Sequence, residues 1–75
     1  MDSSDLTLAQ LETLLRRAEH DLAYLASLRV RMRQVGFPVE DELVQLVDEA
    51  QDRLQRLRMW LHYRVDDRMK RPARQ

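Results

Sequence analysis

Arginine is the residue type in this sequence that is best suited to binding chemistry, because all but one of the 13 basic residues are Arg. A guanidinium group binds phosphate in a bidentate way and stacks on bases, so arginines grouped near aromatic rings suit a nucleic acid. Trp60 and Tyr63 would supply such rings. The candidate residues for nucleic-acid contact are Arg16, Arg17, Arg53, Arg56 and Arg58.

Acidic residues oppose this interpretation. The chain has 13 of them, its formal net charge is zero, and Glu19, Asp48 and Asp52 are interleaved with the candidate arginines. A chain without net charge creates no long-range field for nucleic acid or for anionic lipid. The arginines therefore also fit a solvated helix face. Nucleic acid stays open as a partner, and we expect no membrane partner.

Histidine offers little for metal chemistry. A metal site on helices needs a second ligand three or four residues away on the same inward face. His20 and His62 both fall on the outward side of the apolar stripes described below. The sequence also has no Cys, no Gly-rich phosphate loop and no Ser in a strained turn. We therefore expect no enzyme activity, no metal, no cofactor and no small-molecule substrate.

Two helices are predicted to carry these residues, joined at the only Gly and the first Pro of the chain, Gly36 and Pro38. Thr7 and Gln10 have the spacing of a capping box, which predicts a helix start at Leu8. Gly suits the left-handed residue that ends a helix, and Pro suits the first turn of the next one. The predicted segments are a helix at 8–35, a turn at 36–38, a helix at 39–69 and a frayed basic tail at 70–75.

Each predicted helix carries an apolar stripe with alternating three- and four-residue spacing, which is typical of helices that pack along their length. The first stripe is Leu8, Leu11, Leu15, Ala18, Leu22, Leu25 and Met32, interrupted by Arg29. The second stripe is Leu43, Val47, Ala50, Leu54, Leu57 and Leu61. A short connection makes the helices antiparallel, with paired residue numbers adding up to about 74. The prediction is a single all-α domain, an antiparallel two-helix hairpin spanning 1–75.

A hairpin of 75 residues cannot enclose a core, because each helix shows its partner only one stripe. Small domains gain the missing burial from disulfides, metals or association, and Cys is absent. We therefore predict a protein–protein interaction module that forms a homodimeric four-helix bundle or binds a helical protein partner. The predicted interface residues are Leu11, Leu14, Leu15, Leu22, Leu25, Leu28, Leu43, Val47, Leu54, Leu57, Met59, Trp60, Leu61 and Tyr63.

The sequence carries no sign of export or membrane insertion. Its longest apolar run, 22–26, is far shorter than the roughly 20 residues that span a bilayer. The acidic start at 2–5 differs from the basic start of a signal peptide. We expect a cytoplasmic setting.

Two known families resemble parts of this pattern. A two-helix hairpin with regular apolar stripes resembles the Rop-type plasmid regulators, which dimerise into a four-helix bundle and bind RNA. Gly36, Phe37 and Pro38, followed by Glu42, Leu43, Leu46, Ala50 and Leu54, also look like the turn and second helix of small type III secretion co-chaperones. That resemblance implies an adaptor that shields an aggregation-prone helix. No family-specific motif carries either resemblance residue by residue.

Overall fold

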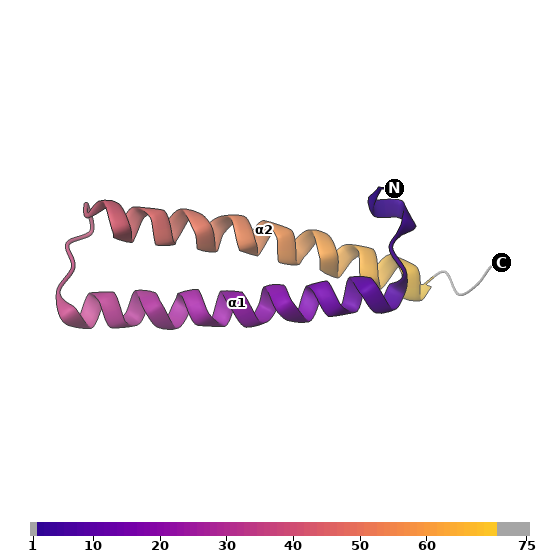
Figure 1. Cartoon of the computed structure of the whole chain (residues 1–75), viewed down its shortest axis with the longest axis horizontal. Helices are drawn as coiled ribbons and strands as arrows, with labels where there is room; N and C mark the ends of the chain where they lie inside the picture. Colours follow the sequence, from indigo (N-terminus) through magenta and orange to yellow (C-terminus); the bar gives the residue numbers. More distant parts are fainter. Residues whose placement is uncertain (1, 71–75) are drawn as a thin grey trace.

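The chain folds into a rod of two antiparallel helices in the computed structural model, which describes residues 2–70. A short 3-10 helix, η1 (Ser3–Asp5), precedes α1 (Leu8–Val35) and α2 (Glu42–Lys70). Figure 1 shows α1 and α2 side by side, joined by a turn at one end of the rod and with η1 at the other. The rod measures 55 × 19 × 16 Å. The predicted all-α hairpin is confirmed, and residues 2–70 contain no strand.

Both predicted end signals of α1 form. Thr7 Oγ1 accepts a hydrogen bond from the Gln10 N–H (3.1 Å), and Gln10 Oε1 accepts one from the Thr7 N–H (2.9 Å), which completes the capping box. At the other end Gly36 is left-handed, with φ of 94°, and its N–H donates to the Met32 and Arg33 carbonyls. A side chain at this φ would be strained, so Gly ends the helix at low energetic cost.

The second helix begins later than predicted. The sequence places its start at 39, but α2 begins at Glu42. Residues 38–41 form a turn closed by the Asp41 N–H, which donates to the Pro38 carbonyl (3.1 Å). Asp41 Oδ1 then accepts from the Leu43 N–H (2.9 Å). Asp is a preferred N-cap residue, so helix initiation at Asp41 replaces initiation at Pro38 and the turn covers 36–41.

The other end of α2 lies within one residue of the predicted end at about 69. Lys70 is its last residue, and the Lys70 ammonium forms an ion pair with Asp66 (3.3 Å). The rest of the predicted frayed tail, 71–75, lies outside the described residues.

The stripe of α2 that faces α1 is rotated relative to the prediction. Val47, Leu54 and Leu61 do face α1, with Val47 and Leu61 buried and Leu54 half-buried. Leu43, Ala50 and Leu57 do not, because all three are exposed. The residues that face α1 are Val44, Val47, Gln51, Leu54, Arg58, Leu61, Val65 and Arg68. This set, with its counterpart Leu8, Leu11, Leu15, Ala18, Leu22, Leu25, Arg29 and Met32 on α1, is called the seam below.

The rotation has a physical reason. Leu43, Ala50 and Leu57 directly precede the seam residues Val44, Gln51 and Arg58, so α2 has two apolar rows one residue apart. An Arg side chain can lie along a helix contact with its stem buried and its charge in water. Arg58 does so, because its side chain is about one-third exposed. The seam thus accommodates residues that a strict apolar pattern would exclude.

The densest packing lies at the end of the rod where η1 lies. Leu11, Ala18, Leu61 and Val65 form a buried cluster there, against which Leu6, Leu8 and Leu15 pack. Arg68 Nη2 donates to the Ser4 carbonyl (3.3 Å), which ties η1 to α2. Asp2 caps η1, and hydrogen bonds from the Ser4 hydroxyl and the Ser4 N–H lower the pKa of the Asp2 carboxyl. None of the helices within 2–70 combines the length and the apolar character that crossing a bilayer requires.

Candidate interaction surface

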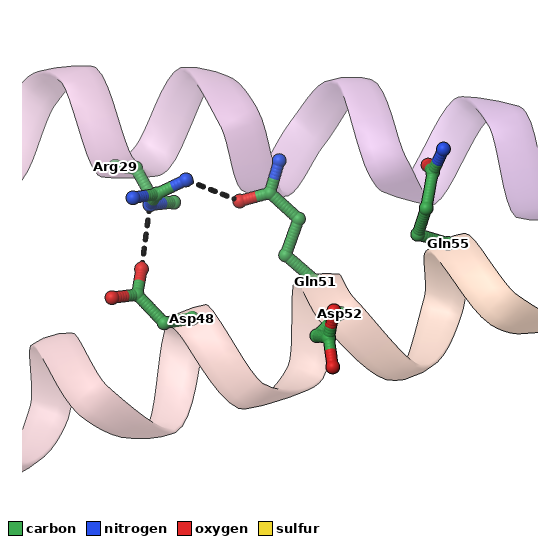
Figure 2. A pocket seen from close by; sticks show the side chains of 5 residues that line it. All are labelled: Arg29, Asp48, Gln51, Asp52 and Gln55. Carbon is green, nitrogen blue, oxygen red and sulfur yellow. Dashed lines mark hydrogen bonds and ion pairs between the residues drawn. The ribbon is translucent and has the colours of Figure 1, made fainter.

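Arg29 is the clearest polar feature of the seam, and its contacts lie on one side of the rod. Its Nε lies 2.6 Å from Asp48 Oδ1, and its Nη1 donates to Gln51 Oε1 (2.9 Å). Figure 2 shows the guanidinium of α1 reaching across to these two side chains of α2. Asp48 Oδ1 is buried and its contact with Nε lacks hydrogen-bond geometry. Charge attraction to Arg29 is therefore what offsets the desolvation of this oxygen.

A second interhelical ion pair lies on the same side of the rod. Arg58 Nη1 is 4.0 Å from Glu19 Oε2. Glu19 and Asp48 each directly follow a buried seam residue, Ala18 and Val47. In an antiparallel pair of right-handed helices, the residues that follow seam positions lie on one common side. Two of the three seam arginines, Arg29 and Arg58, therefore turn their charge to this side, which we call the polar side.

The polar side also carries an open hollow of 430 Å³. It is lined by Arg29, Asp48, Gln51, Asp52 and Gln55 (Figure 2). The lining has one cation, two carboxylates and two amides, and the cation is already paired. Such a composition suits water rather than an apolar ligand.

The opposite side of the rod is formed by residues that directly precede seam positions, and it is largely apolar. Leu43 is 50% exposed, Leu46 is 52% exposed and Leu57 is 47% exposed. Trp60 is 38% exposed and lies in the same row. We call this the apolar side; its apolar members are Leu14, Tyr24, Leu28, Leu43, Leu46, Ala50, Leu57 and Trp60. Val35 extends this side toward the turn.

The apolar side carries charges mainly in its half nearer the termini. Arg64 lies with its guanidinium carbon 4.7 Å from the centre of a Trp60 ring, which is cation–π geometry. Asp21 Oδ1 lies 3.5 Å from Arg17 Nε and 3.6 Å from His20 Nδ1. Toward the turn, the α2 row Leu43, Leu46 and Ala50 carries no charge, and the α1 row carries one, Arg31. The apolar character is therefore strongest on α2, in the half near the turn.

The predicted interface residues divide into three groups. The first group lies in the seam, between the helices of the hairpin itself: Leu11, Leu15, Leu22, Leu25, Val47, Leu54 and Leu61. The second group lies on the apolar side: Leu14, Leu28, Leu43, Leu57 and Trp60. The third group, Met59 and Tyr63, lies away from the apolar side. These two residues line a different hollow, together with His62.

Leu46 belongs to the apolar side although the sequence prediction did not include it among the interface residues. The signal that could have found it is a second stripe on α2. Leu43, Leu46, Ala50, Leu57 and Trp60 repeat at the same three- and four-residue spacing as the seam, interrupted once by Arg53. Two stripes on one helix indicate two packing partners.

The candidate nucleic-acid arginines are spread around the rod. Arg17 and Arg53 lie on the apolar side. Arg16 and Arg58 lie on the polar side, Arg16 because it directly follows the seam residue Leu15. Arg56 points away from the seam, between the two sides.

Acidic side chains accompany several of these arginines. Arg17 pairs with Asp21 (3.5 Å), Arg56 with Asp52 (3.7 Å) and Arg58 with Glu19 (4.0 Å). Arg16 donates to Thr13 Oγ1 at 3.5 Å. The folded chain therefore does not bring these arginines together on one face.

The two histidines are both exposed. His62 lies edge-on to Tyr63, with ring centres 6.5 Å apart. Within residues 2–70, no three His, Asp or Glu side chains converge as metal ligands would.

Comparisons with protein-family models, with curated proteins and with solved structures give no match for this chain.

Proposed function

We propose that this chain is a non-catalytic interaction module that self-associates through its apolar side, forming a homodimeric four-helix bundle. The observation that carries the proposal is the row of half-exposed large side chains on α2, which includes Leu43, Leu46 and Leu57. Monomeric proteins rarely expose contiguous apolar patches unless they are binding sites. The polar side offers no such row.

The exposed area supports the same proposal. The chain exposes 6002 Å², whereas a compact monomer of its size, 9.0 kDa, exposes about 4,900 Å². Part of the difference follows from the elongated shape of any two-helix rod. The difference, about 1,100 Å², nevertheless exceeds the roughly 800 Å² that each partner buries in a standard interface. The rod therefore has enough surface to cover on one long side.

The energetic motive is large compared with the stability of a small domain. Burial of about 800 Å² of apolar area contributes roughly 20 kcal/mol before the costs of association and ordering. Inside the hairpin, only Leu11, Ala18, Met32, Val47, Leu61 and Val65 are buried among the described residues. Association would roughly double the set of covered apolar side chains.

Sedimentation equilibrium from low to high micromolar concentration, with circular dichroism melts at the same concentrations, tests the proposal. We expect a helical dimer whose melting temperature rises with concentration, because mass action stabilises the associated state. A well-folded monomer at every concentration would overturn the proposal. A poorly folded monomer would overturn it too, and would favour the alternative of an adaptor or co-chaperone for a foreign helix.

A matched pair of variants locates the surface. Leu57→Asp places a charge on the apolar side, and Gln55→Asp places the same charge two residues away on the polar side. We expect Leu57→Asp to abolish the dimer and Gln55→Asp to leave it intact. Equal effects of the two variants would contradict the assignment of the apolar side.

A further inference from the structure

We propose that the second copy packs with its turn at the same end of the bundle, so that α1 of each copy lies on α2 of the other. This inference rests on the proposed self-association. Two apolar sides related by a two-fold axis can meet in only two ways. Either the axis runs along the rods and the turns share one end, or it runs across the rods and the turns lie at opposite ends.

Contacts inside the hairpin fix which residues share a height along the rod. Arg29 contacts Asp48, and Glu19 contacts Arg58. In both pairs the residue numbers add up to 77. A two-fold axis along the rods preserves height. Each α1 residue of one copy therefore faces the α2 residue of the other copy whose number brings the total to 77.

The same-end arrangement places complementary groups opposite each other. By this height rule Tyr24 faces Arg53 of the second copy, and Arg17 faces Trp60 of the second copy. Both pairs put a guanidinium beside an aromatic ring, which is an attractive contact. Asp21 lies between Arg53 and Trp60 of the second copy, where a carboxylate is attracted to the guanidinium.

The opposite-end arrangement places like charges together. There α1 lies on α1 and α2 on α2, so one helix faces its own copy. One register that keeps the apolar rows in contact puts Asp21 against Asp21 of the second copy. A shift of one copy along the rod by about half a heptad gives a second register. It puts Arg53 against Arg53 of the second copy and Arg17 against Arg31 of the second copy. Like charges facing each other across an interface are destabilising.

The distribution of apolar residues favours the same-end arrangement as well. Leu28, Leu43, Leu46 and Ala50 lie in the half of the rod near the turn, whereas Arg17 and Arg64 lie in the half near the termini. An axis along the rods places the apolar half of one copy on the apolar half of the other. An axis across the rods overlays part of this apolar half on the charged half.

Distances between spin labels on the dimer test the arrangement. The chain has no Cys, so Glu40→Cys gives one label per copy, in the exposed turn. For same-end packing we expect a label-to-label distance well below half of the 55 Å rod length. A distance above half of that length would overturn the same-end arrangement while leaving self-association standing.

Arg56→Cys supplies a second label position, because Arg56 is exposed near mid-height on the outer surface of α2. In the same-end arrangement α2 lies diagonally across the bundle from α2 of the second copy, whereas in the opposite-end arrangement the two are neighbours, so the Arg56 distance should be the longer one for same-end packing. Sedimentation of both labelled variants is measured first. Monomers in both would overturn the proposed self-association itself, and the inference with it.

Asp21→Asn provides an independent chemical test. In the same-end arrangement the variant loses attraction to Arg53 of the second copy, and we expect the dimer to weaken by up to about fivefold. In the opposite-end arrangement the variant removes repulsion between two copies of Asp21, and the dimer should strengthen. A measured strengthening would therefore contradict the inference.

Discussion

The polar and apolar sides of the rod are built from the same two helices, and they differ in where the seam arginines direct their charge. Arg29 and Arg58 both enter the seam, and both reach Asp48 or Glu19 on the polar side. Their charges are thereby neutralised on one side, and the rows that precede them, including Leu28 and Leu57, remain apolar on the other. These two seam arginines thus give the rod two chemically different sides.

The comparison also separates stability from association. Contacts in the seam and on the polar side hold the two helices together, whereas residues on the apolar side contribute little burial within the hairpin. Substitutions in the seam should therefore change the free energy of unfolding, and substitutions on the apolar side should chiefly change the affinity of one copy for another.

The largest expected effect comes from Leu61→Ala compared with Leu57→Ala. Leu61 is 2% exposed in the terminal cluster, and truncation of a buried Leu costs about 2–5 kcal/mol. Leu57 is 47% exposed, so its truncation should cost the isolated hairpin much less. Urea unfolding at low concentration measures the hairpin, and sedimentation measures association. If Leu57→Ala lowered hairpin stability as much as Leu61→Ala does, the distinction between seam and apolar side would be lost.

Arg29 provides the next test, on the polar side. Arg29→Ala removes the charge partner of the buried Asp48 Oδ1, and we expect a loss of about 1–3 kcal/mol of folding stability. The side chains are partly exposed, so the coupling in a double-mutant cycle with Asp48→Ala should be smaller, about 1 kcal/mol. The affinity between copies should not change, because this pair lies on the side away from the proposed interface. A large loss of affinity would mean that the polar side also contacts the partner.

These tests concern features that the sequence predicts to different degrees. The bounds of α1 follow from local chemistry, because Thr7, Gln10 and Gly36 act on the backbone next to them. The sequence predicts the start of α2 three residues early, because Pro38 and Asp41 both qualify as start signals and only the folded turn decides between them. Local signals therefore suffice where one residue acts alone.

The orientation of α2 was harder to predict, for a reason that concerns the whole hairpin. Two apolar rows one residue apart compete for the seam, and each has leucines, such as Leu57 in one and Leu61 in the other. The observed seam instead contains Gln51 and Arg58. Their partners Arg29 and Glu19 lie on the other helix, so the sequence of α2 alone does not contain this information. The apolar side is the consequence, since the second apolar row stays outside.

Gly36→Ala should lower folding stability by a smaller amount, and it should alter neither the polar side nor the apolar side. Gly36 has φ of 94°, where a Cβ is strained, although the space around it is open. We expect a loss of about 1–2 kcal/mol of folding stability. The dimer should keep its affinity once the hairpin is folded, because the turn does not alter either side. Chemical unfolding and sedimentation of the variant measure the two quantities, and Gln34→Ala, two residues earlier inside the helix, is the matched control. A changed affinity would place the turn in the interface.

The smallest expected effect is that of salt on hairpin stability. Salt also distinguishes association through the apolar side from binding of nucleic acid by the arginines. The ion pairs Arg17–Asp21, Arg56–Asp52 and Lys70–Asp66 are exposed pairs within one helix, each worth about 0.3–0.5 kcal/mol. At about 1 M salt the screening length falls to roughly 3 Å, so hairpin stability should fall by about 1 kcal/mol. Association through the apolar side should weaken by no more than the roughly fivefold factor assigned to the attraction between Asp21 and Arg53, because burial of apolar area, its main contribution, involves no net charge. A nucleic-acid complex would weaken far more, since each phosphate contact releases counterions and affinity falls steeply with salt.

Sedimentation at low and high salt, alone and with a labelled RNA or DNA duplex, distinguishes self-association from nucleic-acid binding. An assembly that dissociates as salt rises would assign the binding surface to the arginines and not to the apolar side.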